Sequence, residues 1–127
     1  MAGEADLTVL LRTMRPKLHA QPYGYAVSDR AVAGAFAQIV EPEGMTVIAT
    51  LAVLAAHGIP TDSAWARISL TVHSDLAAVG LTAAIAQALA AQGISANVVA
   101  GFYHDHVFVQ WERREDAIAA LRGLSGV

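Results

Sequence analysis

Residues 65–109 have the sequence WARISLTVHSDLAAVGLTAAIAQALAAQGISANVVAGFYHDHVFV, in which a strand pattern is followed by a helix pattern. From Ala66 to His73 apolar and polar residues alternate, as in a strand with one buried face. The period then changes at Ser74, whose hydroxyl can accept hydrogen bonds from the free N–H groups of a first helical turn. We therefore expect a strand that passes directly into a helix at Ser74 and Asp75.

The expected helix has apolar residues four positions apart, at Leu81, Ile85 and Leu89. Gly80 lies early in it, where glycine costs about 1 kcal/mol relative to alanine but permits a backbone or a ligand to approach closely. Gly93 predicts the end of the helix, because glycine adopts the left-handed conformation that closes a Schellman motif. In that motif Ile94 would pack back onto the last turn.

Two further strands are expected after this helix, at about 95–103 and 106–110, with His104-Asp105 as a two-residue hairpin loop. In this hairpin Val98 faces the helix and Asn97 faces the other side. Asn97 is a poor strand former, and its amide needs hydrogen-bond partners that a ligand or a neighbouring subunit can supply. The face of Asn97 also carries Phe108, which predicts contact with another protein surface.

Four runs in this region resemble a small bacterial family of ACT-domain proteins, in which one short chain contains two ACT-like units. The runs are TVHS at 71–74, AVGLTAA at 78–84, GISANVVAG at 93–101 and YHDH at 103–106. In the N-terminal half the resemblance rests on EPEG at 41–44, which also reads as a turn. The resemblance implies an α+β fold of two tandem ferredoxin-like (βαββαβ-type) ACT units, with antiparallel sheets covered by helices on one face. The units would occupy residues 1–61 and 62–127.

The same resemblance implies a regulatory, non-catalytic protein that binds a small molecule, with an amino acid as the expected ligand, and pairs as a homodimer. ACT ligands commonly bind beside the first strand–helix turn and the facing strand. The expected ligand-binding residues are His73, Ser74, Asp75, Gly80, Leu81, Asn97 and Val98. A helix start can hold a carboxylate and Asp75 an ammonium group, so the pair suits a zwitterion. The alternative is that Ser74 only caps the helix and Asp75 is solvated.

One strand of the C-terminal ACT unit is missing from its own half of the sequence. A βαββαβ unit needs a fourth strand after its last helix, here about 113–122, and only residues 123–127 remain. We expect the N-terminal unit, permuted or incomplete, to lend this strand, with Tyr23–Ser28 as the leading candidate. Before it, a helix from Leu7 to about Arg15, N-capped by Asp6, and a loop over Lys17–Pro22 are predicted.

Composition excludes several classes of function. Hydrophobic residues make up 55% of the 127, charged residues 15%, and the net charge is −3 with no basic cluster, which disfavours nucleic acid and anionic membranes as partners. The absence of cysteine excludes disulfides and thiolate catalysis. No signal peptide or membrane span is evident, so a cytoplasmic protein is expected.

No catalytic set emerges from the sequence, and neither a cofactor nor a metal site is expected. It contains no nucleophile-elbow serine and no phosphate-binding glycine loop. Two alternatives to the regulatory reading stay open. One is a metal-dependent enzyme that uses His73, His104 and His106, with Asp105 as a fourth ligand. The other is a ligand-free dimerisation or adaptor module.

Overall fold

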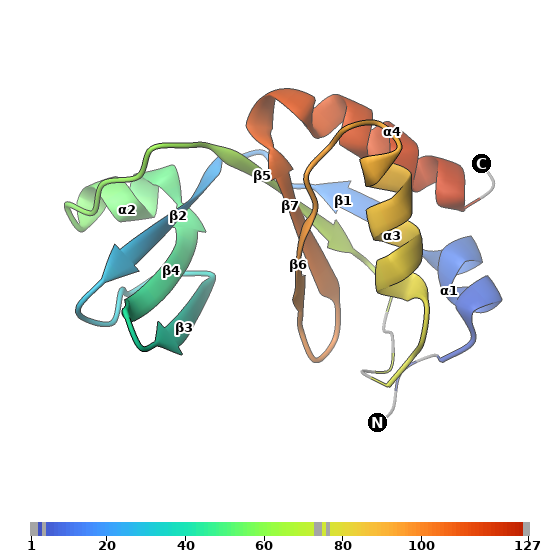
Figure 1. Cartoon of the computed structure of the whole chain (residues 1–127), viewed down its shortest axis with the longest axis horizontal. Helices are drawn as coiled ribbons and strands as arrows, with labels where there is room; N and C mark the ends of the chain where they lie inside the picture. Colours follow the sequence, from blue (N-terminus) through green and yellow to red (C-terminus); the bar gives the residue numbers. More distant parts are fainter. Residues whose placement is uncertain (1–2, 4, 73–74, 76, 126–127) are drawn as a thin grey trace. The chain divides into compact units, whose positions relative to one another are not determined.

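The computed structural model describes residue 3, residues 5–72, residue 75 and residues 77–125 (Figure 1). Spatial contacts divide the chain into two compact units, Met1–His19 with Ala66–Val127 (unit 1) and Ala20–Trp65 (unit 2). The predicted halves, residues 1–61 and 62–127, are successive repeats along the sequence. A division by spatial contacts does not test where such repeats begin and end. That division stays a prediction.

Unit 1 holds the strands and helices of the C-terminal half together with an N-terminal helix and strand. Its elements are α1 (Leu7–Thr13), β1 (Pro16–Leu18), β5 (Trp65–Leu70), α3 (Leu81–Ala90), β6 (Asn97–Ala100), β7 (Asp105–Gln110), η1 (Trp111–Arg113) and α4 (Arg114–Leu124). The strands lie in the order β1-β5-β7-β6, and both β1–β5 and β6–β7 are antiparallel. Figure 1 shows α3 and α4 side by side against these strands. The predicted α+β fold is confirmed.

The strand that completes unit 1 is β1. It pairs with β5 in the register Pro16↔Leu70, Lys17↔Ser69 and Leu18↔Ile68. The expectation of a loop from Lys17 is therefore wrong, because a three-residue strand is too short to show a period of two. The N-terminal part of the chain does supply the missing strand, but Tyr23–Ser28 was the wrong candidate: it pairs along its whole length with β4 (Gly44–Thr50).

The core of unit 1 unites residues from both ends of the chain. Leu10 and Met14 of the N-terminal segment are fully buried, in the same cluster as apolar residues of α3, α4 and the strands. The other buried members are Ala66, Ile68, Leu70, Leu81, Ile85, Leu89, Ile94, Val107, Val109, Ala117, Ile118 and Leu121. As predicted, Asp6 caps α1, since its side chain accepts a hydrogen bond from the Val9 N–H at 3.2 Å. Residues 7–14 thus contribute buried side chains to the core, and residues 66–121 without them would have an incomplete core.

Helix α3 begins at Leu81, later than expected. Its N-cap is Gly80, with φ 102°, so the predicted helix start at Ser74 and Asp75 is wrong. The Asp75 carboxylate instead accepts a hydrogen bond from the Ala77 N–H at 2.7 Å, a local turn that competes with helical hydrogen bonding. The apolar period of four starts only at Leu81, which is where the helix can begin to bury a face.

The β6–β7 hairpin has a four-residue loop, 101–104, where two residues were expected. The pairs are Val98↔Val107 and Ala100↔Asp105, a register shifted by four residues from the predicted one. Because the shift is even, each strand residue keeps its expected face. The loop closes through a hydrogen bond from the Gly101 N–H to the His104 carbonyl at 2.9 Å. A Cβ on Gly101 would lie 2.7 Å from that oxygen, so this glycine permits a close backbone approach.

The aromatic residues of the hairpin differ from expectation. Phe108 is fully buried within the chain, so its predicted contact with another protein surface is wrong. The expected strand at 95–103 would place Phe102 in phase with Val98, facing the core, but Phe102 lies in the loop and is 59% exposed, in edge-to-face contact with Tyr103. The wrong loop length explains the second error, since it placed both aromatic residues inside the ladder.

Unit 2 is a three-stranded antiparallel sheet with one short helix. Its elements are β2 (Tyr23–Ser28), β3 (Ala37–Glu41), β4 (Gly44–Thr50) and α2 (Leu51–Ala56), with the strand order β3-β4-β2. Pro42 and Glu43 form the predicted turn between β3 and β4, since Glu41 pairs with Gly44. The buried residues of its core are Ala26, Val32, Val47, Ala49 and Leu54.

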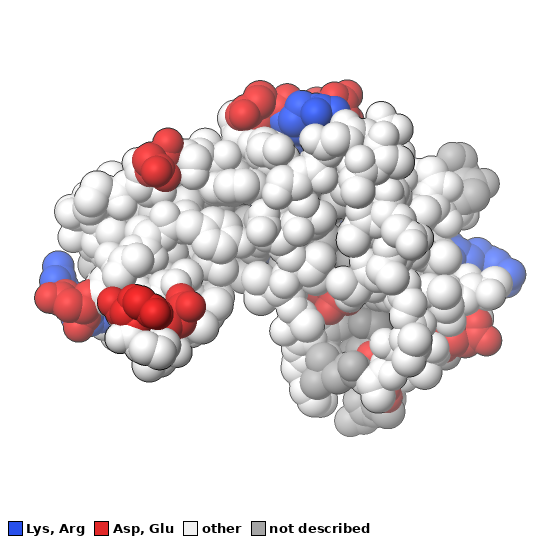
Figure 2. All heavy atoms as spheres, viewed as in Figure 1, with Lys and Arg blue, Asp and Glu red and all other residues white. Residues whose placement is uncertain are grey.

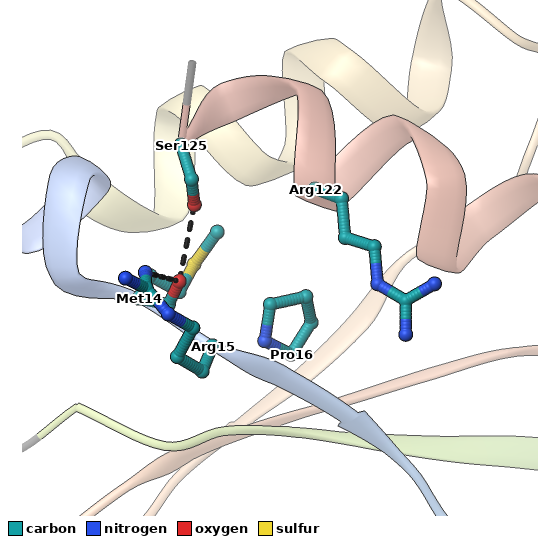
Figure 3. A pocket seen from close by; sticks show the side chains of 5 residues that line it. All are labelled: Met14, Arg15, Pro16, Arg122 and Ser125. Carbon is teal, nitrogen blue, oxygen red and sulfur yellow. Dashed lines mark hydrogen bonds between the residues drawn. The ribbon is translucent and has the colours of Figure 1, made fainter. Parts of the chain in front are cut away.

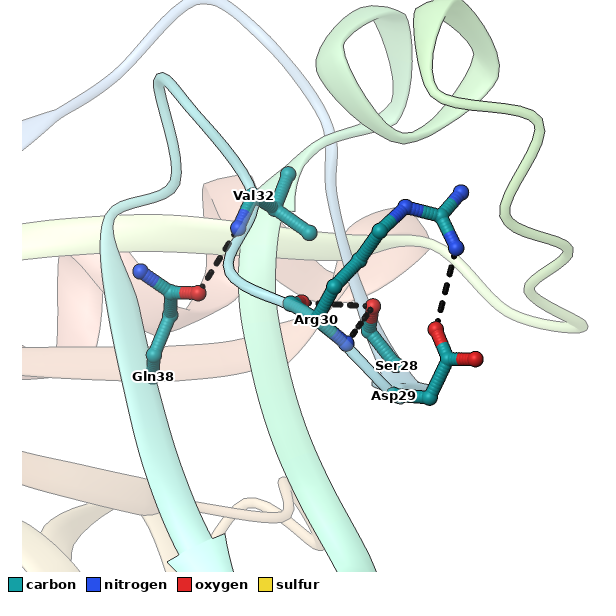
Figure 4. Close-up of polar contacts among 5 residues, drawn as sticks. All are labelled: Ser28, Asp29, Arg30, Val32 and Gln38. Atoms are coloured by element: carbon teal, nitrogen blue, oxygen red, sulfur yellow. Dashed lines mark hydrogen bonds and ion pairs between the residues drawn. The ribbon is translucent and has the colours of Figure 1, made fainter.

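The loop that follows β2 is held by side chains (Figure 4). The Ser28 hydroxyl donates to the Arg30 carbonyl at 2.7 Å and accepts from the Arg30 N–H at 3.2 Å. Farther along, the Val32 N–H donates to the Gln38 side-chain oxygen at 2.9 Å, which ties the loop to β3. These bonds satisfy backbone groups that lie outside the ladder.

Helices α2 and α3 end in the same way, one in each unit. The Ile59 N–H donates to the Leu54 carbonyl at 2.9 Å, and the Ile94 N–H donates to the Leu89 carbonyl at 3.0 Å. In both cases the intervening glycine has a positive φ, 67° at Gly58 and 70° at Gly93. The predicted Schellman stop of α3 is confirmed, and α2 repeats it.

Candidate ligand site

The structure describes five of the seven residues expected to bind a ligand, while His73 and Ser74 lie outside the described residues. The Leu81 side chain is 3% exposed and belongs to the core of unit 1. The Val98 side chain is partly buried and packs against the same core. Both side chains therefore stabilise the fold, and Leu81 has almost no surface left for a ligand.

Gly80 does permit a close approach, and the group that approaches is a side chain of the protein. A Cβ on Gly80 would lie 2.9 Å from Cδ2 of Leu7 in α1. The positive φ of Gly80 also turns the chain into α3. These two observations give the glycine a structural role at the junction of α1 and α3.

Asn97 and Val98 point to opposite faces of the sheet, as alternation along β6 requires. Asn97 is exposed, and its amide donates a long hydrogen bond of 3.4 Å to the Phe108 carbonyl on the facing strand. A ligand on the helix-covered face would therefore meet the side of Val98 and not the Asn97 side chain. The predicted set of residues does not converge on one point, although the assignment of these residues to a ligand site stays a prediction.

The helix-covered face carries a buried acid that sequence reasoning placed in the hairpin loop. Asp105 is the first residue of β7 and is only 8% exposed. It alternates in phase with Val107 and Val109, both fully buried in the core of unit 1. Burial raises the pKa of Asp105, and the nearby His104 opposes that rise. An acid in phase with two core valines was the sequence signal that could have identified it.

The start of β7 lies beside the end of β5. Nδ1 of His104 is 3.3 Å from the Val72 carbonyl oxygen, and the Ser69 hydroxyl is 2.8 Å from Nδ1 of His106. Asp105 lies between these two contacts, at the end of the sheet where the chain leaves β5 toward Asp75. Asp105 is thus at the end of unit 1 where β5 ends.

The opposite face of the same strands carries a chain of polar side chains. The Ser69 hydroxyl is 6% exposed and lies 2.7 Å from Nε2 of His19 and 2.8 Å from Nδ1 of His106. One arrangement of protons satisfies all three groups: His19 donates to the serine oxygen, and the serine donates to an unprotonated Nδ1 of His106. Arg67 lies at the same face, with Nη2 3.4 Å from Nδ1 of His106.

Both histidines of this chain favour the neutral form. Burial lowers the pKa of His106 to about 4, with further lowering by the positive charges of Arg67, His104 and His19. Burial also lowers the pKa of His19, followed by the charges of Arg67 and Lys17. The cluster is therefore uncharged at its histidines near pH 7, as the hydrogen-bond pattern requires.

The residues that the structure describes do not support the hypothesis of a metal site formed by the histidines and Asp105. Nδ1 of His104 is directed to a backbone carbonyl, and His106 contacts Ser69 on the other face of the sheet from Asp105. Among the described residues no group of three His, Cys, Asp or Glu side chains could hold a metal ion. His73 lies outside that part of the chain.

A separate pocket of about 430 Å³ lies where α1, β1 and the end of α4 meet (Figure 3). Met14, Arg15, Pro16, Arg122 and Ser125 line it. Nη1 of Arg15 donates to the Arg12 and Met14 carbonyls at 3.0 and 2.9 Å, and the Ser125 hydroxyl donates to the Met14 carbonyl at 3.0 Å. The Arg15 guanidinium and the Ser125 hydroxyl thus satisfy carbonyls that are free at the end of α1. This structural role explains these two polar side chains without a ligand.

Comparison with known proteins agrees with this architecture. One ACT-domain model matches residues 2–66 and a second matches residues 61–123. A Vibrio cholerae protein of unknown function, described as a possible transport protein, is 41% identical, with a TM-score of 0.82, over 94% of this chain and 95% of that one. An Agrobacterium tumefaciens protein is 18% identical, with a TM-score of 0.73, over 88% of this chain and 89% of that one. The sequence matches none of the curated proteins.

A likeness of fold alone extends to an enzyme's regulatory subunit. The regulatory subunit of aspartate kinase from Thermus thermophilus, in its ligand-free form, is 16% identical, with a TM-score of 0.59, over 90% of this chain and 98% of that one. The order β1-β5-β7-β6 with helices α3 and α4 defines an α+β protein of the ferredoxin-like class. Within that class, the chain belongs to the ACT-domain family. Across the described residues, no helix is both long and apolar enough to cross a membrane.

Proposed function

We propose that this protein is a non-catalytic regulatory protein of the cytoplasm that binds an amino acid through its ACT units. The observation that carries the proposal is the succession of two ACT-domain matches, which together cover residues 2–123. The two matches thereby cover nearly all of the 127 residues with ACT sequence. The described residues also contain no close group of three metal-ligating side chains.

The ligand would act by binding one arrangement of the protein more tightly than another. A ligand shifts a conformational equilibrium only by its difference in affinity for the two states. We place the ligand at the end of unit 1 where β5 ends, β7 begins and the Asp75 turn leads to α3. We further propose that the protein is a homodimer and that the ligand changes the contacts between subunits or with a partner.

A thermal-shift screen of the 20 L-amino acids, each at millimolar concentration, tests the proposal. A ligand present at 100 times its Kd stabilises the folded state by about 2.7 kcal/mol, enough for a clear rise of the melting temperature. Size-exclusion chromatography with light scattering, with and without the stabilising amino acid, reports the subunit number. Divalent metals belong in the same screen, with Asn97→Ala and Ser74→Ala as variants.

The results separate the proposed function from its alternatives. A shift with one or a few amino acids supports a ligand-binding protein. A homodimer that responds to no amino acid and no metal would instead be an adaptor, and the proposed function would be abandoned. Stabilisation by a divalent metal that is lost in His104→Ala would favour the metal-dependent enzyme.

A further inference from the structure

Asp105 is an acid buried among apolar residues of the unit 1 core. Its side chain is 8% exposed and shares a face with Val107 and Val109 of the core. In the part of the chain that the structure describes, no hydrogen bond or ion pair reaches its carboxylate. Buried carboxylates almost always have such partners, because an unpaired charge in an apolar setting is costly.

Arg67 and Lys17 do not lie on the face of the sheet that carries this carboxylate. Arg67 lies on the opposite face of β5, toward His106. The single lysine, Lys17, is exposed and pairs in register with Ser69, which belongs to that opposite face. On the face of unit 1 drawn in Figure 2, the blue atoms of basic residues lie near α4 and near α1. Among the described residues, His104 is the charged group that acts on this carboxylate, and no ion pair or hydrogen bond compensates it, so a ligand can supply a positive partner.

The carboxylate is recessed but not sealed. In the described part of the chain, the oxygens of Asp105 are not among the fully buried polar atoms that lack a hydrogen-bond partner, so they keep some exposure to solvent. A small group can therefore reach it from the surface. His104 shapes this approach, because its ring is held by the Val72 carbonyl at 3.3 Å and by its position in the hairpin loop.

We propose that the Asp105 carboxylate binds the ammonium group of the ligand, so that the site selects molecules that carry a protonated amine. The proposal rests on the proposed function and specifies which part of the ligand this residue recognises. A primary ammonium group is a compact donor that supplies both the charge and the hydrogen bonds that the carboxylate lacks. A divalent cation would need further protein ligands, and His106 faces away on the other side of the sheet.

The first test compares matched probes on the wild-type protein by isothermal titration calorimetry. The probes are L-alanine with L-lactate, L-phenylalanine with L-phenyllactate, and L-aspartate with L-malate, extended to the 2-hydroxy analogue of any other amino acid that stabilises the protein. Each pair differs only in the replacement of the ammonium group by a hydroxyl. We expect the amino acid that binds to do so at least tenfold more tightly than its hydroxy analogue. Equal affinity for the two members of the pair would overturn the proposal.

The second test uses Asp105→Asn, which keeps the shape of the side chain and removes its charge. We expect affinity for the amino acid to fall at least tenfold, while the ligand-free variant melts a few degrees higher than the wild type because a buried unpaired charge is gone. The matched control is Asp29→Asn, since Asp29 is an exposed aspartate of unit 2, and both quantities should stay at their wild-type values.

The outcomes separate this proposal from the proposed function. If amino acids bind and Asp105→Asn binds them as tightly as the wild type, only the role of Asp105 is overturned. A lower melting temperature of ligand-free Asp105→Asn would also overturn it, because that result means the carboxylate has a structural partner. If no amino acid binds the wild type, both the proposed function and this assignment are wrong.

Discussion

Leu7 and Gly80 are in contact although 73 positions separate them in the sequence, and the contact requires that residue 80 lack a side chain. A Cβ on Gly80 would lie 2.9 Å from Cδ2 of Leu7. The backbone at Gly80 also has φ 102°, a conformation that residues other than glycine rarely adopt. Through this contact α1 is fixed against the start of α3, next to the segment that leads to the candidate ligand site.

Gly80→Ala is expected to destabilise the protein by about 2 kcal/mol, since the new methyl group meets Leu7 and the backbone is strained. Urea unfolding followed by circular dichroism measures the change. Gly123→Ala is the matched control, because Gly123 lies within α4 and a Cβ there would meet nothing within 4 Å. That variant should gain about 0.5 kcal/mol from helix propensity. Equal effects of the two substitutions would contradict the role given to Gly80.

Gly58→Ala and Gly93→Ala are expected to cost similar amounts, about 1 kcal/mol each. Both glycines have a positive φ, and a Cβ at either would have open space around it, so the cost comes from the backbone conformation alone. Urea unfolding of the two single variants checks this equality. A difference of more than about 1 kcal/mol between them would mean that the two helix stops are not equivalent.

The free energy of unfolding is expected to fall as the pH decreases from 6.5 toward 4, partly because of His106. The pKa of His106 is lowered to about 4 in the folded state, so between these values the unfolded chain binds more protons than the folded one. The contribution is fully present above pH 6.5 and is lost as the pH falls toward 4. Its size is on the order of 2 kcal/mol after a discount for the partial exposure of the ring.

His106→Asn provides the comparison for this pH dependence. The amide does not titrate and can still accept a hydrogen bond from Ser69, so the variant should lose less stability than the wild type between pH 6.5 and 4. Thermal melts in a series of buffers give both profiles. His19 remains in the variant and, because its pKa is also lowered, retains a smaller loss in the same direction. Parallel profiles for the two proteins would exclude His106 as the source.

Leu10→Ala is expected to destabilise the protein by about 3 kcal/mol, because Leu10 is fully buried in the core of unit 1. Thr8→Ala, on the exposed side of the same helix, should change stability by less than about 0.5 kcal/mol. For the same reason residues 61–127 alone, without α1 and β1, should not melt cooperatively. A soluble fragment with a sharp thermal transition would show that the N-terminal segment is dispensable.

The sequence alone determined the features that depend on near neighbours. The cap at Asp6, the end of α1 before Pro16, the turn at 42–43 and the stops at Gly58 and Gly93 all depend on hydrogen bonds over two to five residues. Periodicity also predicted the residues of α3 that face the core, and the resemblance of four runs to ACT-domain proteins implied the class of fold. Such signals are local, so they can be recognised without knowing what lies opposite.

Only the tertiary structure decided the pairing of β1 with β5, the start of α3 at Leu81 and the burial of Asp105. The pairing joins residues about 50 positions apart, and three residues are too few to show a strand pattern. The start of α3 follows Gly80, which lies against Leu7 from the N-terminal segment. An aspartate beside a histidine in a loop-like sequence is read as exposed, and the hairpin register alone places it among core valines. The physical reason is common to all three: long-range packing fixes which face and which partner a residue has, and local sequence does not encode that choice.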